Sequence, residues 1–139
     1  ECKAEDFDGV VVLLRQLWPG RSLDLDALRN TFDDSLGSDG RVLLCAESDG
    51  KVVGFGSLTL KRSLGSAAPV GYVDEMVIDE EHRGRGIGGR ILECLTFWAR
   101  DQGCGHVELD SAFHRKDAHA FYERRGFKSY ALLYSKALR

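Results

Sequence analysis

The chain has 139 residues, of which 43% are hydrophobic and 29% are charged, and its net charge is -3 at pH 7. This length favours one domain over residues 1–139, and the net negative charge disfavours general nucleic-acid binding. No apolar run approaches the roughly 20 residues of a membrane span, and no signal peptide opens the sequence. We therefore expect a cytoplasmic protein with neither a membrane nor a nucleic acid as partner.

Hydrophobic periodicity predicts helices over residues 7–18, 25–36 and 117–125, and a long helix from residue 87 that Gly103 and Gly105 terminate. Apolar runs predict strands over 41–47, 51–60, 70–78, 106–110 and 127–138. Asp49-Gly50 is a strong hairpin signal between the first two strands. This order of elements, an antiparallel meander followed by a β-α-β-α-β end, indicates an α/β (α+β) fold with a mixed sheet.

The cysteines and histidines give no sign of a metal site. Cys2, Cys45, Cys94 and Cys104 lack a spacing such as C-x-x-C, and the four histidines are scattered. Three of the cysteines fall in apolar segments, so we expect reduced core thiols.

A glycine-rich segment with three arginines lies between the strand over 70–78 and the long helix. Glycines allow a tight turn whose N–H groups converge, and the first turn of the helix adds unpaired donors and the positive end of its dipole. Such a loop binds a phosphate or pyrophosphate well. The segment consists of Arg83, Gly84, Arg85, Gly86, Ile87, Gly88, Gly89 and Arg90.

Two common phosphate-binding folds do not fit this loop. A Rossmann loop follows the first strand and has an acidic residue about 20 positions on, whereas this loop follows three strands. No Walker lysine-serine pair follows the glycines either. The phosphates are therefore expected to belong to another cofactor.

Two motifs together resemble the Gcn5-related N-acetyltransferases (GNAT). Arg83-x-x-Gly86-x-Gly88 follows a strand, and Ala118-x-x-Phe121-Tyr122-x-x-x-Gly126-Phe127 comes about 30 residues later. The resemblance implies the GNAT fold, a mixed, mostly antiparallel twisted sheet flanked by about four helices, with acetyl-CoA in the cleft between the fourth and fifth family strands. The family's usual first strand is nearly absent here, so we expect the native protein to begin a few residues earlier.

The resemblance also implies which residues bind acetyl-CoA. The glycine loop holds the pyrophosphate, and the backbone of Met76, Val77 and Ile78 hydrogen-bonds the pantetheine arm. The second motif adds Ala118, Phe121 and Tyr122. Arg115 stands where the family often has Asn, and its guanidinium could instead meet a coenzyme phosphate.

Acetyl transfer to an amine needs a base, because the acceptor is an ammonium at pH 7. Asp74 and Glu75 precede the pantetheine segment, and adjacent strand residues point to opposite faces unless a bulge intervenes. We favour Glu75, which shares strand parity with Val77 and matches a Glu of the similar aminoalkylphosphonate acetyltransferases. Backbone N–H groups near Met76 could polarise the thioester oxygen. The alternative is that both acids are rim charges or salt-bridge partners.

The departing thiolate of coenzyme A needs a proton, and the resemblance implies that Tyr122 supplies it; the alternative is that Tyr122 only packs. A covalent acetyl-cysteine on Cys45, Cys94 or Cys104 is a second route. Of these, only Cys104 has a histidine, His106, at a telling spacing. Direct attack in a ternary complex is the favoured mechanism.

The sequence leaves the acceptor open. Five aspartates near the second helix would attract a cationic amine, although they also fit a solvated helix face. The start of the chain resembles aminoglycoside 6'-N-acetyltransferases, and the end resembles aminoalkylphosphonate enzymes, whose anionic substrate His114, Arg115 and Lys116 could meet. The aspartates are Asp24, Asp26, Asp33, Asp34 and Asp39.

We therefore predict an acyltransferase (EC 2.3.1.-) that moves an acetyl group from acetyl-CoA to a primary amine of a small molecule. Alternative functions are acetylation of protein N-termini or lysines, and a sensor that binds acetyl-CoA without turnover. Polyamines stay open as acceptors, and so does a homodimer.

Overall fold

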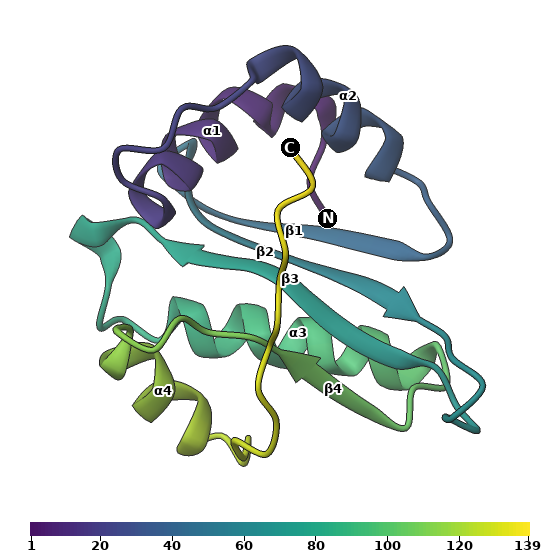
Figure 1. Cartoon of the computed structure of the whole chain (residues 1–139). Helices are drawn as coiled ribbons and strands as arrows, with labels where there is room; N and C mark the ends of the chain where they lie inside the picture. Colours follow the sequence, from purple (N-terminus) through teal and green to yellow (C-terminus); the bar gives the residue numbers. More distant parts are fainter. The chain divides into compact units, whose positions relative to one another are not determined.

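A computed structural model describes residues 1–139 (Figure 1), which form two compact units, Glu1–Glu108 and Leu109–Arg139. The prediction of a single domain over residues 1–139 stays a prediction. No helix is both long and apolar enough to cross a membrane. In chain order the elements are η1 (Ala4–Asp6), α1 (Phe7–Leu17), α2 (Leu25–Ser35), β1 (Arg41–Ser48), β2 (Lys51–Lys61), β3 (Val70–Ile78), η2 (Glu80–His82), α3 (Ile87–Asp101), β4 (His106–Leu109) and α4 (Lys116–Glu123).

The sheet has the strand order β1-β2-β3-β4, and the pairs β1·β2 and β2·β3 are antiparallel. Asp49 and Gly50 both have positive φ, 51° and 76°, which is the geometry that a tight two-residue hairpin requires. The α3 crossover connects β3 to β4, and the sheet is mixed as predicted. Every predicted helix and the first four predicted strands are present, with ends within about two residues of those expected.

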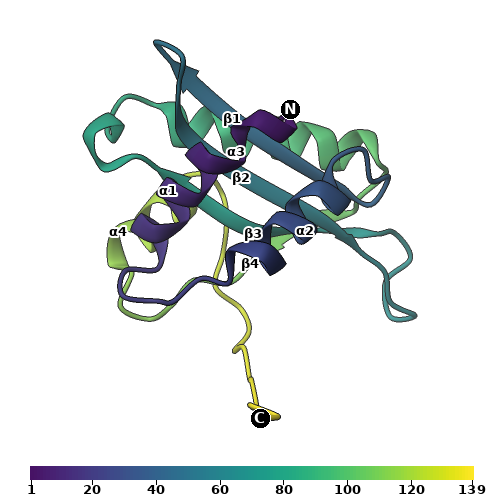
Figure 2. The ribbon, with the colours of Figure 1, turned by 90° about the horizontal axis from the view of Figure 1, so that it is seen from above.

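One face of the sheet packs against α1 and α2 (Figure 2). Phe55 of β2 and Val77 of β3 join a buried cluster with residues of both helices. At its centre the rings of Phe7 and Phe32 meet edge to face, with centroids 5.5 Å apart. Burial of this apolar stripe holds α1 across the sheet and fixes which strand residues face it.

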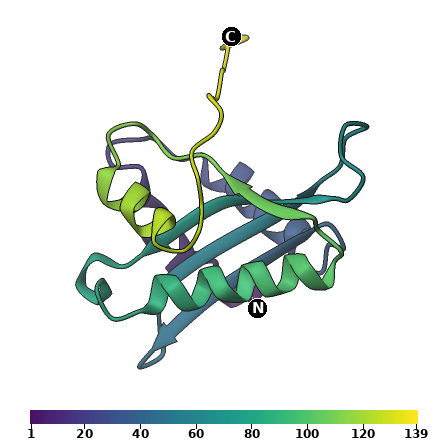
Figure 3. The same ribbon diagram turned by 90° about the horizontal axis from the view of Figure 1, so that it is seen from below.

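The other face packs against α3 (Figure 3). Gly54 and Gly56 of β2 let the helix approach closely: a Cβ on Gly56 would lie 2.5 Å from Cγ2 of Ile91. Ile91 and Leu95 are buried there, with 6% and 0% of their surface exposed. This contact sets the height of α3, and therefore of the glycine loop at its start, above the sheet.

The last predicted strand, over residues 127–138, is wrong. This segment forms no helix or strand, and its large apolar side chains are exposed, Tyr134 by 85% and Leu138 by 90%. An apolar run favours a strand, but a strand forms only where a neighbouring strand supplies its hydrogen bonds.

The prediction of reduced core thiols is wrong for Cys2 and Cys45, while Cys94 and Cys104 are free thiols. Cys2 and Cys45 form a disulfide with their Cα atoms 5.3 Å apart, Cys94 is exposed and Cys104 is half-buried. The backbone N–H of Cys2 donates to the carbonyl of Leu43 at 2.9 Å, which brings the N-terminal segment beside β1. A pairing over 43 positions leaves no local signal in the sequence.

Candidate active site

The glycine loop presents free backbone donors at the start of α3. Gly84 and Gly86 have positive φ, 77° and 81°, a conformation that favours glycine. Gly86 is the N-cap of α3, and no side chain caps the helix. The first N–H groups of α3 therefore have neither an intrahelical acceptor nor a capping one, which is the arrangement that an anion such as pyrophosphate satisfies.

Two of the loop's arginines donate hydrogen bonds to backbone carbonyls that precede the loop. Nε of Arg83 donates to the carbonyl of Ile78 at 3.1 Å, and a terminal nitrogen of Arg85 donates to the carbonyl of Glu81 at 3.3 Å. All three arginines, Arg90 included, are exposed. Their remaining donors can therefore meet phosphate oxygens.

A buried carboxylate fastens the loop to the sheet. Asp79, directly after β3, accepts hydrogen bonds from Nε2 of Gln16 at 2.8 Å and from Nδ1 of His82 at 2.7 Å, and Lys51 lies 3.9 Å away. Gln16 of α1 also accepts the N–H of Glu80 at 3.0 Å. The hydrogen bonds from Gln16 and His82 lower the pKa of Asp79 below its ordinary value of 3.8, so it is ionised at neutral pH. The sequence prediction missed this cluster, because Gln16 lies 63 positions before Asp79 and 64 before Glu80.

A β-bulge changes the orientation of the two candidate bases. Ser57 of β2 pairs with Glu75, but the next residue, Leu58, pairs with Val73, so Asp74 is an extra residue in β3. This is the bulge that the parity argument required if both acids were to share a face.

The structure accordingly brings Asp74 and Glu75 to one face. The hydroxyl of Thr59 donates to the Asp74 carboxylate, and that of Ser57 donates to the Glu75 carboxylate. Ser57 and Thr59 are two residues apart on β2, so they share a face, and Phe55 of the same parity packs in the cluster with α1. Both carboxylates therefore lie on the α1 and α2 side of the sheet.

The environment of Glu75 suits a general base. Burial raises the pKa of Glu75 above its ordinary value of 4.5 and the charge of Asp74 raises it further, while the Ser57 hydrogen bond and the charge of Arg41 oppose the rise. Asp74 is exposed. A carboxylate whose pKa moves toward the operating pH is a better proton acceptor.

Tyr122, Arg115, Ala118 and Phe121 belong to the second unit. The Tyr122 ring packs edge to face on Phe121 and Phe127, with centroids 5.2 and 5.7 Å apart. Burial raises the pKa of Tyr122 above 10.0, against the opposing charge of Arg115. The phenol is therefore protonated at neutral pH and can donate a proton.

The cysteines are poorly arranged for covalent catalysis. Cys45 is tied up in the disulfide, and burial raises the pKa of Cys104 above 9.0. His106, the one histidine at a telling spacing from Cys104, pairs with Glu108 at 2.9 Å. A thiol with a raised pKa is a poor nucleophile at neutral pH.

One group of side chains could in principle ligate a metal. Ligand atoms of Cys2, Asp6 and Cys45 lie within 4.8 Å of one another. Both sulfurs, however, are in the disulfide, and the Asp6 carboxylate accepts the N–H of Lys3 at 2.7 Å. The expected lack of a metal stays a prediction.

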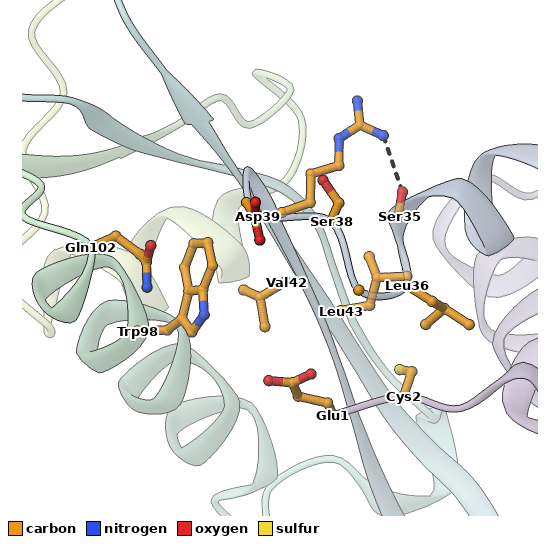
Figure 4. Close-up of a pocket in the computed structure, with 12 residues that line it drawn as sticks. Glu1, Cys2, Ser35, Leu36, Ser38, Asp39, Val42, Leu43, Trp98 and Gln102 are labelled. Carbon is orange, nitrogen blue, oxygen red and sulfur yellow. Dashed lines mark hydrogen bonds between the residues drawn. The ribbon is translucent and has the colours of Figure 1, made fainter.

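A hollow of about 340 Å³ lies around β1. Figure 4 shows Trp98 and Gln102 of α3 on one side of the strand and Ser35 on the other, hydrogen-bonded to Arg41 at 3.1 Å. None of the predicted catalytic or coenzyme-binding residues lines it, but Asp39, one of the five aspartates predicted to attract a cationic amine, does.

The comparisons with known proteins agree with this geometry. The profile of the Acetyltransferase (GNAT) family matches residues 8–127. The aminoalkylphosphonate N-acetyltransferase of Salmonella typhimurium is 34% identical over 134 residues, which are 96% of this chain and 86% of that protein. The aminoglycoside N(6')-acetyltransferase type 1 of Stenotrophomonas maltophilia is 30% identical over 81% of this chain and 73% of its own length. The crystal structure of glucosamine-6-phosphate N-acetyltransferase from Arabidopsis thaliana superimposes with a TM-score of 0.84 at 25% identity, covering 100% of this chain and 96% of that one.

The fold and the loop define an acetyl-transferring enzyme. The chain belongs to the GNAT family of acetyltransferases. The predicted family, the predicted GNAT fold and the acyltransferase class are thereby confirmed, as is acetyl-CoA as co-substrate at the level of the family. The roles of the individual site residues stay predictions.

Proposed function

We propose that this chain transfers the acetyl group of acetyl-CoA to the primary amine of a small molecule, by direct attack in a ternary complex. The observation that carries the proposal is the bulge in β3, which puts Asp74 and Glu75 on one face just before a glycine loop with free donors. The relatives named above are called acetyltransferases of an aminoglycoside, an aminoalkylphosphonate and glucosamine 6-phosphate, all of them small molecules with amino groups.

The glycine loop would bind the pyrophosphate of the coenzyme through the first N–H groups of α3 and through Arg83, Arg85 and Arg90. The backbone of Met76, Val77 and Ile78 would run along the pantetheine arm. In the second unit, Arg115, Ala118, Phe121 and Tyr122 complete the proposed coenzyme contacts.

Glu75 would take a proton from the ammonium group of the acceptor, directly or through water, and so produce the neutral amine that attacks. Ser57 orients its carboxylate, since the Ser57 hydroxyl donates to the carboxylate and accepts the N–H of Glu75 at 3.2 Å. The neutral amine then attacks the thioester carbon, and as the C–S bond of the tetrahedral adduct breaks, the adduct nitrogen releases its second proton to water and the thiolate of coenzyme A leaves. Tyr122 would protonate that thiolate, because its raised pKa keeps the phenol protonated until the thiolate forms.

The test is a panel of amines assayed for thiol release from acetyl-CoA, followed by Glu75→Gln on the best acceptor. We expect kcat/KM to fall about 100-fold, the scale of general-base catalysis. Glu75→Gln should also flatten the acidic limb of the pH profile, which in the wild type lies above the ordinary range of Glu.

Asp74→Asn is the matched control, because Asp74 shares the face and is exposed. A 100-fold loss in Asp74→Asn with none in Glu75→Gln would transfer the role of base to Asp74. A chain that binds coenzyme A but releases thiol with no amine would be a sensor, and turnover only on peptides would identify a protein acetyltransferase.

A further inference from the structure

A second positively charged site lies where α1 ends and α2 begins. A hollow of about 390 Å³ is lined there by Arg15, Trp18, Gly20, Arg21, Ser22 and Leu23. None of these residues belongs to the glycine loop or to the two candidate bases. Its two guanidiniums, its hydroxyl and its indole face one space, which is an unusual collection for a chain of net charge -3.

Neither guanidinium of this hollow is neutralised. Arg15 and Arg21 are exposed, and neither forms a salt bridge. The next acid along the chain, Asp24, is engaged elsewhere, because its carboxylate caps α2 by accepting the N–H of Ala27 at 3.0 Å. An anion would therefore meet two arginines with free donors.

The hollow is also partly preorganised. The guanidinium of Arg21 lies over the Trp18 ring, 4.6 Å from its centroid, and Trp18 is itself packed against the core. Stacking restrains the plane of the guanidinium but leaves its edge N–H groups open. Those edges have the fork geometry that binds phosphate or phosphonate oxygens in pairs.

The end of α1 is fixed next to the end of β3. Gln16, adjacent to Arg15, holds the carboxylate of Asp79 and the N–H of Glu80. Glu75 is on β3, four residues before Asp79. The proposed base and the end of α1 therefore belong to elements that these hydrogen bonds hold together, which favours an acceptor with an amine at one end and an acidic group at the other.

We propose that Arg15 and Arg21 bind a phosphate or phosphonate group of the acceptor, so that the enzyme selects amines that carry such a group. This inference rests on the proposed function. A phosphate of the coenzyme has the same chemistry, but the glycine loop already offers three arginines and free N–H groups to the coenzyme. The subsite also decides between the two acceptor classes, since a polycationic aminoglycoside would be repelled by two unpaired arginines.

The kinetic test compares 2-aminoethylphosphonate with ethanolamine, which has the same two-carbon amine without the phosphorus. Arg15→Gln and Arg21→Gln should each raise KM for 2-aminoethylphosphonate at least tenfold, with kcat within threefold and KM for ethanolamine and acetyl-CoA unchanged. Arg100→Gln is the matched control, because Arg100 is an exposed arginine in the last turn of α3 as Arg15 is in the last turn of α1.

Two kinetic results would overturn the proposal. A rise in KM for acetyl-CoA alone would assign the subsite to a coenzyme phosphate. Unchanged KM values, or an equal rise for both amines, would show that the arginines recognise no acidic group.

An equilibrium measurement separates this inference from the proposed function. Inorganic phosphate in the millimolar range should shift the indole N–H resonance of Trp18 in the wild type but not in Arg21→Gln, and should leave that of Trp98 unmoved. If phosphate shifts the Trp18 resonance but the protein acetylates no amine, the anion site is supported and the proposed enzymatic function is rejected. No shift of Trp18 would reject the anion site whatever the activity.

Discussion

Replacing Gly56 by alanine tests whether the close approach of α3 to the sheet holds the coenzyme loop in place. The added Cβ would lie 2.5 Å from Cγ2 of Ile91, 3.1 Å from Cδ1 of Leu95 and 3.3 Å from Sδ of Met76. Ordinary contacts of a Cβ begin at 3.4 Å, so the helix must retreat by about 1 Å. Ile91 and Leu95 are buried and cannot turn away.

Overpacking of this kind costs about 1–3 kcal/mol, which lowers Tm by roughly 3–12 °C for a domain of this size. Because α3 begins at the glycine loop, we also expect weaker binding of coenzyme A. Both effects are measured directly, by thermal unfolding followed by circular dichroism and by titration calorimetry with coenzyme A.

Gly40→Ala is the control, because nothing lies within 4 Å of the place that its Cβ would take and its φ is not in the left-handed region. Its Tm should stay close to that of the wild type. If Gly56→Ala and Gly40→Ala have the same Tm and bind coenzyme A with the same affinity, the reasoning that Gly56 sets the position of α3 is refuted.

Three further predictions concern the loop, its anchor and the second unit. Gly86→Val should weaken coenzyme binding tenfold or more, about 1.4 kcal/mol, because φ at Gly86 is +81°; unchanged affinity in calorimetry, with far-UV circular dichroism like that of the wild type, would contradict the assignment. Asp79→Asn should raise KM for acetyl-CoA and lower Tm. Because Gln16 and His82 lower the pKa of Asp79, the difference in stability between the wild type and Asp79→Asn should be fully present above pH 3.8. It should vanish as the pH falls through the lower pKa of Asp79 in the folded state. Tyr122→Phe should reduce kcat more than it changes the Kd of acetyl-CoA, with stability moving by at most about 1 kcal/mol; kcat within twofold of the wild type would show that Tyr122 only packs.

The sequence predicted those features whose causes are local. The helices over 7–17 and 87–101 follow from apolar spacing, and the hairpin at Asp49-Gly50 follows from residues that tolerate positive φ. The glycine loop could also be predicted, because the tight turn, the free donors and the arginines are all encoded in eight consecutive positions. In the same way Asp24 could be expected to cap α2, as its side chain does.

Features that depend on contacts between distant segments were not predictable. The disulfide joins residues 43 positions apart, and the Asp79 cluster joins α1 to the end of β3 across 63. The expected strand over 127–138 failed for the same reason: its apolar residues are suited to a strand, but whether the segment pairs is decided by another part of the chain. Periodicity predicts which side chains share a face, but it does not predict which other segment packs or pairs with that face.

The bulge at Asp74 is where this distinction bears most directly on function. Strand parity alone placed Glu75 on the face of Val77, and the register confirms that, since Glu75 pairs with Ser57 and Val77 with Phe55. Parity without a bulge would place Asp74 on the opposite face, but the bulge that the prediction allowed for is present and turns the Asp74 carboxylate to Thr59. Burial raises the pKa of Glu75, and the charge of Asp74 on the same face adds to that rise. The bulge thus gives Glu75 the environment that the proposed proton acceptor needs, and it leaves Asp74 exposed on the same face.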